Sequence, residues 1–180
     1  MLQQNYQKAI KFAGEIHKSQ LVPGSNANYL LHISNVAMEI LVAYQNNKDF
    51  DIDFAVQLAI LHDTIEDGVN IDYDVIKKEF GEKIAKGVLA LTKNENLKNK
   101  KAKMSDSLKR ILKEPKEVAL VKIADRITNL QTPPKTWSAE KINNYYLEAK
   151  YLAKKLMGNN DYLDLRINSQ LSIYEGYCKF

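Results

Sequence analysis

The sequence predicts an all-α fold, a single domain made of a bundle of roughly seven to nine helices. Apolar residues recur at the spacing of an amphipathic helix along nearly the whole chain, as they do at Ala9, Phe12, Ala13 and Ile16. The strict alternation typical of a strand is almost absent, and signals that begin or end helices repeat. With 180 residues, 45% of them hydrophobic, the chain is long enough to bury one core.

The N-terminal half is predicted to contain helices separated by one irregular loop. The first helix is expected to end near His17, and residues 21–28, with a proline, a glycine and two asparagines, are expected to form the loop. The next helix opens with His32 directly after this loop. Asp53 is placed to cap a further helix over residues 54–66, because Asp is a favoured N-cap residue.

The middle of the chain is divided by a second set of helix signals. Asp72 precedes a helix over residues 73–80, and Gly81 follows it, as glycine commonly does at a helix end. Residues 94–103 are polar and rich in lysine, which predicts a mobile surface connection. A buried helix is then expected over residues 118–130, where apolar residues dominate.

The end of the chain is predicted to add two more helices. Pro133 and Pro134 interrupt the chain before them, because proline cannot donate a backbone hydrogen bond. Ser138 is placed to cap a helix that Gly158 ends, and the last helix is expected over residues 161–178.

Composition and charge narrow the classes of function. The formal net charge is +4, and lysines crowd residues 93–122, which admits an anionic ligand. No aromatic residue interleaves these lysines as base stacking would require, so a solvated face is favoured over nucleic-acid binding. Cys178 is the only cysteine, which favours a reducing compartment, the cytoplasm. We expect neither secretion nor membrane insertion, since no signal-peptide pattern or spanning apolar stretch is present.

The most informative string is residues 59–67, where an apolar helix suddenly presents four ionisable side chains. His62, Asp63, Glu66 and Asp67 fall close together, and burying them unpaired would cost several kcal/mol. A continuous helix would place Glu66 one turn beyond His62 and Asp67 one turn beyond Asp63. A divalent cation would compensate these charges, because imidazole and carboxylate together suit Mn²⁺, Fe²⁺ or Zn²⁺.

A second group of polar residues follows the apolar run at residues 119–124. Asp125 comes first, and a continuing helix would place Asn129 and Thr132 on the same face. His32 can project from the start of its own helix toward a neighbouring element. Together with the string at 59–67, these residues offer two imidazoles and two carboxylates from three separate helices.

Each candidate ligand also has a structural interpretation. A His-Asp pair often satisfies its own hydrogen bonds, and Asp125 could pair with Lys122 or Arg126. The conjunction of four ligand-type residues at the edges of apolar helices nevertheless favours a metal site over independent structural roles. His17, at the end of the first helix beside Lys18, is interpreted as structural.

Four residues occur in an order that resembles the H…HD…D signature of the HD-domain metal-dependent phosphohydrolases: His32, His62, Asp63 and Asp125. Longer strings, HDTIED at residues 62–67 and VKIADRITNL at 121–130, resemble the hydrolase domain of the Rel/SpoT enzymes and the small stand-alone alarmone hydrolases. The resemblance implies one HD-type helical domain over residues 1–180, with an HD core at about 9–156 and a C-terminal helix at 161–178.

The same resemblance implies a reaction and roles for individual residues. Enzymes of this kind remove pyrophosphate from the 3′ position of guanosine tetra- and pentaphosphate with Mn²⁺; Fe²⁺, Zn²⁺ or Ni²⁺ are alternatives. The implied metal ligands are His32, His62, Asp63 and Asp125. The residues implied to act on the attacking water are Glu66 and Asp67. The residues implied to line the nucleoside pocket are Asn129 and Thr132, and those implied to touch phosphates are Lys141, Tyr145 and Lys98.

One loop departs from the Rel/SpoT pattern, in which a basic pair packs on the guanine base. Residues 20–29 contain no basic residue at all. This favours, as an alternative, an HD phosphohydrolase that acts on another nucleotide, such as a nucleoside monophosphate or a 2′- or 3′-phosphorylated cofactor. A non-catalytic nucleotide sensor is a further alternative, which Glu66 and Asp67 argue against because a pure binder needs no activated water. The expected partner is a small anionic nucleotide rather than a membrane, and no oligomeric state is indicated.

Overall fold

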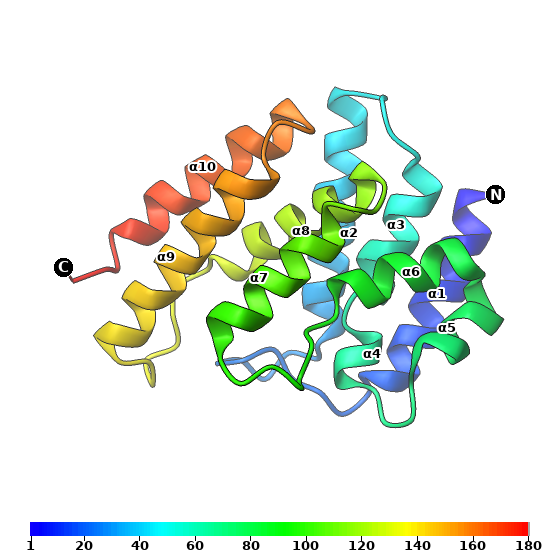
Figure 1. Cartoon of the computed structure of the whole chain (residues 1–180), viewed down its shortest axis with the longest axis horizontal. Coiled ribbons are helices and arrows are strands. Elements are labelled where there is room, and N and C mark those ends of the chain that lie inside the picture. Colours follow the sequence, from blue (N-terminus) through cyan, green and yellow to red (C-terminus); the bar gives the residue numbers. More distant parts are fainter. Residues whose placement is uncertain (180) are drawn as a thin grey trace.

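The computed structural model describes residues 1–179 and is all-α, as the sequence predicts (Figure 1). Within these residues there are ten helices and no strand, apart from one isolated bridge between Leu21 and Asn28. None of the described helices is both long and apolar enough to cross a lipid bilayer. In chain order the helices are α1 Leu2–Ile16, α2 Leu30–Asn46, α3 Ile52–Leu61, α4 Thr64–Asp67, α5 Tyr73–Phe80, α6 Glu82–Leu91, α7 Lys100–Ile111, α8 Lys116–Asn129, α9 Ala139–Leu156 and α10 Asp161–Glu175.

Helix α3 lies inside the bundle and packs against α1, α2, α6 and α8 (Figure 1). Its sequence is apolar on nearly all sides, as expected of a helix without a solvent face, and residues 58–61 are fully buried. Helix α8 is buried along most of its length, and α9 and α10 pack against it at the left of Figure 1. Helix α3 ends just before His62 and Asp63, and α8 carries Asp125. The core therefore holds both helices that position these predicted metal ligands.

Several predicted helix ends are confirmed by their hydrogen bonds. The side chain of Asp72 accepts from the backbone N–H of Val75 at 3.0 Å, and the hydroxyl of Ser138 accepts from that of Lys141 at 3.2 Å. Gly81 ends α5 with a φ of 87°, a left-handed conformation that favours glycine. These three signals are local in sequence, so they could be identified without knowledge of the packing.

The helix predicted over residues 54–66 is divided in two, which corrects both its start and its continuity. Asp51, not Asp53, is the N-cap, because its carboxylate accepts from the N–H of Phe54 at 3.0 Å. At the other end the hydroxyl of Thr64 donates to the carbonyl of Leu61 at 2.7 Å, and α3 stops before His62. The division adds one helix to the number that the sequence predicts. Glu66 and Asp67 therefore do not continue the helix that precedes His62 and Asp63, as the predicted spacing assumed.

Three other boundaries differ from the prediction. Within the predicted connection 94–103, α7 begins at Lys100, because Asn99 caps it by accepting from the N–H of Ala102 at 2.8 Å. Helix α8 ends before Thr132, since a following proline disfavours helical geometry at the residue that precedes it. The last helix ends at Glu175 rather than at residue 178, because the next residue, Gly176, has a low helix propensity.

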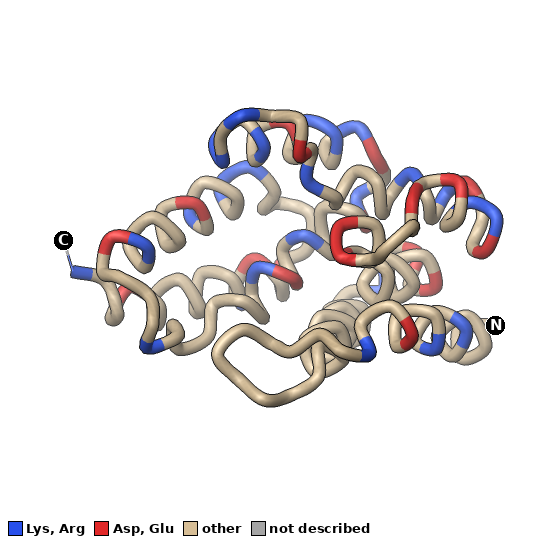
Figure 2. Tube along the Cα trace, turned by 90° about the horizontal axis from the view of Figure 1, so that it is seen from below, with Lys and Arg blue, Asp and Glu red and all other residues tan. Residues whose placement is uncertain are grey.

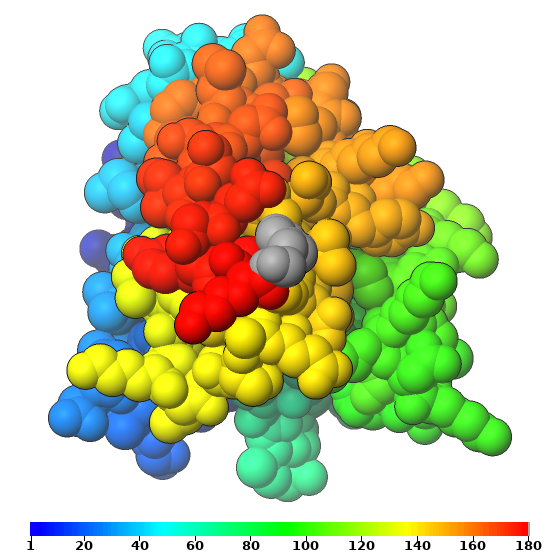
Figure 3. Space-filling model, turned by 90° about the vertical axis from the view of Figure 1, so that its left-hand side faces the viewer, coloured from blue at the N-terminus to red at the C-terminus, as the bar shows by residue number. Residues whose placement is uncertain are grey.

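The loops that follow α1, α4, α6 and α8 gather along one edge of the molecule, the lower edge of Figure 1. The loop after α1 folds back on itself, and the N–H of Val22 donates to the carbonyl of Ala27 at 2.9 Å. The segment after α8 lies against the C-terminal residues (Figure 3), where the hydroxyl oxygens of Thr132 and Tyr177 are 3.1 Å apart. These loops surround the end of the bundle at which α3 stops.

Gly68 ends α4 at a point with no room for a side chain. A Cβ atom there would lie 2.4 Å from the carbonyl oxygen of Thr64 and 2.6 Å from Cγ1 of Ile71. We expect Gly68→Ala to lower the free energy of unfolding by about 1–3 kcal/mol, the usual cost of overpacking. Urea unfolding followed by circular dichroism measures this change.

Gly14→Ala in α1 is the matched control for that substitution. The added Cβ would meet only Cδ1 of Leu30, at an ordinary contact distance of 3.7 Å. Because alanine is the better helix former, this variant should be as stable as the original protein or gain up to about 1 kcal/mol. Equal stability of the two alanine variants would contradict the proposed lack of space at Gly68.

Candidate metal centre and substrate cavity

Four ligand-type side chains reach one point in the core from three parts of the chain. His32 lies in the first turn of α2, His62 and Asp63 lie in the break between α3 and α4, and Asp125 lies in α8. His62 is only 1% exposed, and His32 and Asp125 are each 6% exposed. The break after α3 brings two adjacent residues into the same cluster.

The donor atoms of these side chains lie close enough to share one ion. The Nε2 atoms of His32 and His62 are 3.4 Å apart. Nε2 of His62 lies 2.9 Å from Oδ2 of Asp63 and 3.9 Å from Oδ1 of Asp125, while Nε2 of His32 lies 3.4 Å from that Oδ1 atom. His32, His62 and Asp63 form a group able to hold a metal ion, and Asp125 adjoins it.

Hydrogen bonds behind the two imidazoles leave only Nε2 facing the cluster. Nδ1 of His62 donates to the carbonyl of Ala59 at 2.8 Å, since a carbonyl can only accept. Thr128 donates its one hydroxyl proton to the carbonyl of Asp125 at 2.9 Å and therefore accepts from Nδ1 of His32 at 3.3 Å. Two Nε2 lone pairs that face each other across 3.4 Å repel unless a proton or a cation lies near them, so the residues fit a bound cation.

The carboxylates give the cluster a negative potential. Burial disfavours a charged His62, yet Asp63 and Asp125 raise the pKa of its imidazole to about 9. Burial also disfavours a charged Asp63, but His62 and the hydroxyl of Tyr29 lower the pKa of that carboxyl group. Without a cation the site thus holds a proton on His62, which a metal ion would displace on binding.

Residues around the cluster orient its carboxylates. The hydroxyl of Tyr29 donates to Oδ2 of Asp63 at 2.5 Å. Lys122 donates to Oδ2 of Asp125 at 2.8 Å, and the side-chain amide of Asn129 donates to Oδ1 of Asp125 at 2.5 Å. The sequence interpretation considered Lys122 only as a structural partner and missed Tyr29 and Thr128. Helical spacing around Asp125 could have identified Thr128, whereas nothing local signals the contact between Tyr29 and Asp63.

Glu66 and Asp67 lie together on α4 but have different partners. Both carboxylate oxygens of Glu66 are engaged by Lys93, one by its ammonium group at 2.6 Å and the other by its backbone N–H at 3.2 Å. Oδ2 of Asp67 accepts from the side-chain amide of Gln20 at 2.9 Å. Lys93 and Gln20 come from distant parts of the sequence, and the sequence interpretation assigned a role to neither.

A cavity of about 460 Å³ opens beside the metal cluster. His32 belongs to its wall, so the cavity begins at the cluster itself. It brings together three of the predicted substrate-binding residues, Asn129, Thr132 and Tyr145, although α8 does not extend to the second of them. The rest of the wall is Val22, Pro23, Leu31, Asn35, Thr128, Gln131, Pro133, Pro134, Trp137 and Tyr174.

The two predicted lysines lie apart from this cavity. Lys141 lines a smaller neighbouring cavity of about 280 Å³, which shares Tyr145 with the larger one, and its ammonium group lies 4.2 Å from the centre of the Trp137 ring. Lys98 follows α6 and is not part of either wall in the described chain. In Figure 2 the loop that follows Lys18 is drawn entirely without charged residues, so the wall that it contributes is neutral.

Two named proteins are similar to this chain in sequence. The guanosine-3′,5′-bis(diphosphate) 3′-pyrophosphohydrolase of Aquifex aeolicus is 34% identical over 128 residues, which cover 70% of this chain but 17% of that protein. The guanosine-3′,5′-bis(diphosphate) 3′-pyrophosphohydrolase MESH1 of Danio rerio is 27% identical over 174 residues, which cover 94% of this chain and 93% of that protein.

A solved structure and a family model identify the fold and the family. The structure, described as a metazoan ortholog of SpoT that hydrolyzes ppGpp, matches with a TM-score of 0.80 at 22% identity and covers 94% of each chain. This match confirms the predicted HD-type bundle. The model of the HD domain family matches residues 9–155, most of the chain. The protein therefore belongs to the HD-domain family.

Proposed function

We propose that this protein is a metal-dependent phosphohydrolase that removes pyrophosphate from the 3′ position of guanosine tetra- and pentaphosphate. The observation that carries the proposal is the convergence of four ligand-type side chains, three of them buried, beside a cavity of about 460 Å³ whose wall includes His32, a size typical of small-molecule sites. The relatives in Aquifex aeolicus and Danio rerio, whose names give this reaction, support it.

We propose His32, His62, Asp63 and Asp125 as the ligands of one Mn²⁺ ion, with Fe²⁺, Zn²⁺ or Ni²⁺ as alternatives. Imidazole and carboxylate donors suit these cations, and the tautomers set by Ala59 and Thr128 present both Nε2 atoms. A bound divalent cation would lower the pKa of a water molecule and neutralise charge on the phosphate under attack.

The remaining residues position the reactants. Asp67, with Oδ1 free of a described partner, accepts the proton of the attacking water, while Lys93 holds Glu66 in place on the same helix. A bond forms between the water oxygen and the phosphorus next to the 3′ oxygen. The bond from that phosphorus to the 3′ oxygen breaks, the 3′ oxygen takes up a proton, and pyrophosphate leaves. Asn129 and Thr132 hold the nucleoside in the cavity, and Tyr145, which also lines it, touches a phosphate. Lys141 and Lys98, outside this wall, attract the phosphates through their charge.

A second candidate is hydrolysis of another nucleotide by the same metal centre. The uncharged loop wall, Val22 and Pro23, favours it because a base would find no cation to stack against there. A sensor that binds a nucleotide without turnover is disfavoured, because a carboxylate pair held beside the metal centre serves no purpose in mere binding. The proposed partner in each case is a small anionic nucleotide, and the single cysteine, Cys178, supports a cytoplasmic location.

Loss of one imidazole or carboxylate ligand should remove the metal and the activity together. We expect His62→Ala and Asp63→Ala to purify without bound metal, because the remaining donors bind weakly and leave a buried charge uncompensated. Elemental analysis of the purified variants measures the stoichiometry. Asp74→Ala, on the exposed side of α5, is the control and should keep a full complement of metal. Unchanged stoichiometry in both site variants would disprove the ligand assignment.

Glu66→Gln and Asp67→Asn should keep the metal but lose turnover. Each substitution preserves shape and removes charge. Asp67→Asn removes the proposed general base, which typically lowers kcat about a hundredfold or more, and Glu66→Gln breaks the ion pair with Lys93 on the same short helix. Steady-state kinetics and metal analysis on the same preparations separate the two effects. If either variant loses metal, that residue is a ligand; if both keep full activity, the pair has only a structural role.

The Mn²⁺-loaded protein should release pyrophosphate from guanosine tetraphosphate, with a high KM and weak preference for guanine over adenine. A missing cation–π contact is worth about 0.5–2 kcal/mol, or up to some thirtyfold in affinity. Val22→Arg should therefore lower KM for the guanosine nucleotide, while Ser25→Arg, at the loop tip and outside the cavity wall, adds the same charge without this effect. Cleavage of another nucleotide with guanosine tetraphosphate left intact would favour the second candidate.

A further inference from the structure

His17 is a buried titratable residue to which the metal centre assigns no role. It follows α1 directly, its side chain is inaccessible to solvent, and its Nε2 atom has no hydrogen-bond partner. Leaving a ring nitrogen buried without a partner costs free energy. The other ring nitrogen, Nδ1, lies 2.6 Å from Oε1 of Gln20. The hydrogen bond of the His17 ring that can explain its burial is therefore the one at Nδ1.

The hydrogen bonds from His17 run in one direction and end at Asp67. Oδ2 of Asp67 can only accept, so the atom of Gln20 that faces it at 2.9 Å is the donor Nε2. Oε1 of Gln20 therefore faces His17, and Nδ1 of His17 must carry the proton. The carboxylate at the end of the chain thus determines both the orientation of the Gln20 amide and the tautomer of His17.

The backbone around Gln20 is held on both sides. Its N–H donates to the carbonyl of His17 at 3.0 Å, and its carbonyl accepts from the N–H of Tyr29 at 2.9 Å. The Tyr29 ring lies between those of His17 and His32, with centroids 5.1 and 5.0 Å away, and its hydroxyl donates to the metal-ligand candidate Asp63. The support of Asp67 is therefore built on the same framework as the metal cluster.

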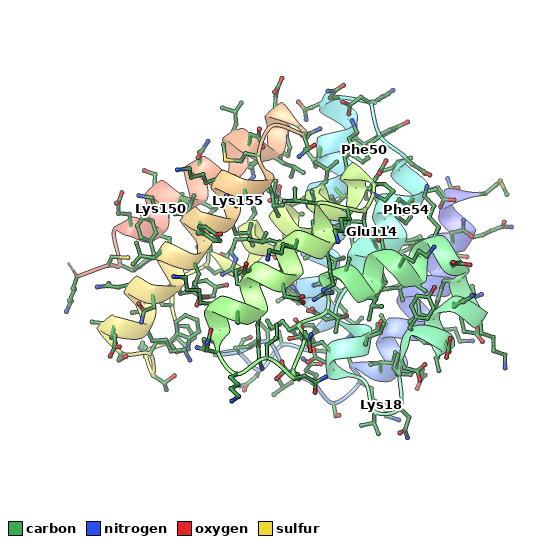
Figure 4. All side chains as sticks on the ribbon, in the orientation of Figure 1. Lys18, Phe50, Phe54, Glu114, Lys150 and Lys155 are labelled. Carbon is green, nitrogen blue, oxygen red and sulfur yellow. The ribbon has the colours of Figure 1, made fainter. Side chains whose placement is uncertain are left out.

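The two carboxylates of α4 differ in what this support leaves them able to do. Glu66 has both oxygens bound to Lys93, whose positive charge balances its own. Asp67 receives one neutral amide donor on one oxygen, which keeps its charge uncompensated and leaves Oδ1 available. The labelled Lys18, the neighbour of His17, lies at the same edge of the molecule as α4 (Figure 4), and α1 contacts α4 there.

We propose that Gln20 and His17 are positioning residues that hold Asp67, rather than Glu66, as the proton acceptor of the reaction. This inference rests on the proposed function, because it assumes that a carboxylate of α4 acts on the attacking water. Gln20 fixes the direction of the Asp67 carboxylate without neutralising it. His17 in turn fixes the Gln20 amide, since it offers a donor where a free amide could rotate.

Gln20→Leu is the direct kinetic test, because it removes both hydrogen bonds from a side chain that is only partly buried. We expect kcat to fall about tenfold to a hundredfold, as for a misplaced catalytic group, with metal content and KM little changed. Ser19→Ala, the exposed neighbour, should have no effect. In an Asp67→Asn background Gln20→Leu should cost nothing further, because it acts only through Asp67. The proposal would be overturned if the two losses of kcat added in the double variant, or if Gln20→Leu alone kept the kcat of the original protein.

A measurement on the original protein tests the arrangement without turnover. Two-dimensional ¹⁵N NMR distinguishes the two neutral imidazole tautomers, and His17 should carry its proton on Nδ1. An Nε2-protonated His17 would overturn the proposal whichever nucleotide is the substrate. Failure of the metal-loaded protein to cleave any nucleotide would instead refute the proposed function and with it the catalytic role of Asp67, while the tautomer would still report whether the chain of hydrogen bonds exists.

Discussion

The gathering of two carboxylates and two imidazoles, three of these four groups buried, at one point of the core is the constraint on which the rest of this structure depends. Bringing such groups out of water costs several kcal/mol unless charges or hydrogen bonds compensate them. The chain supplies part of this compensation through Lys122, Tyr29 and Thr128, each bonded to a ligand side chain or its backbone. What remains is a negative potential around the two Nε2 atoms, which a divalent cation neutralises on displacing the proton that His62 otherwise holds. A substrate can then reach this cluster only where the cluster borders the cavity.

The break between α3 and α4 links the buried cluster to the solvent-accessible edge. A continuous helix would carry His62 and Asp63 onto faces about 100° apart, with successive residues turning steadily away from one another. Instead, the hydroxyl of Thr64 donates a hydrogen bond to the carbonyl of Leu61. The chain then continues as a short helix that ends at Gly68. Adjacent residues can then serve one site, and α4 places Glu66 and Asp67 within reach of Lys93 and Gln20.

Local chemistry explains which parts of this arrangement the sequence predicts. Helix caps such as Asp72 and Ser138 depend on residues three positions apart, and the cluster of ionisable groups at residues 62–67 is anomalous in any apolar helix. The choice of Asp51 over Asp53 as a cap is not local, because Asp53 is taken by Asn5 of α1 and the N–H of Asp51 by Glu117 of α8. The partners of Glu66 and Asp67 are likewise set by packing between distant segments. Sequence patterns therefore point to the candidate reactive groups, while tertiary contacts determine the partners of each one.

Substrate selection is physically separable from the metal chemistry in this protein. The metal cluster, the residues that donate hydrogen bonds to it and the α4 carboxylates lie on or next to helices of the bundle. Substitutions in the packed core of this bundle are poorly tolerated. Half of the cavity wall is contributed by loops, namely the neutral turn with Val22 and Pro23 and the segment that contains Pro133 and Pro134. Gly24 packs against that segment, and a Cβ added at this glycine would lie 3.2 Å from Cγ of Pro134. Because the two loops contact each other, a change in one alters the shape presented by the other. Base recognition can therefore change through these loops, by stacking on Trp137 or through a new cation, while the hydrolytic centre stays the same.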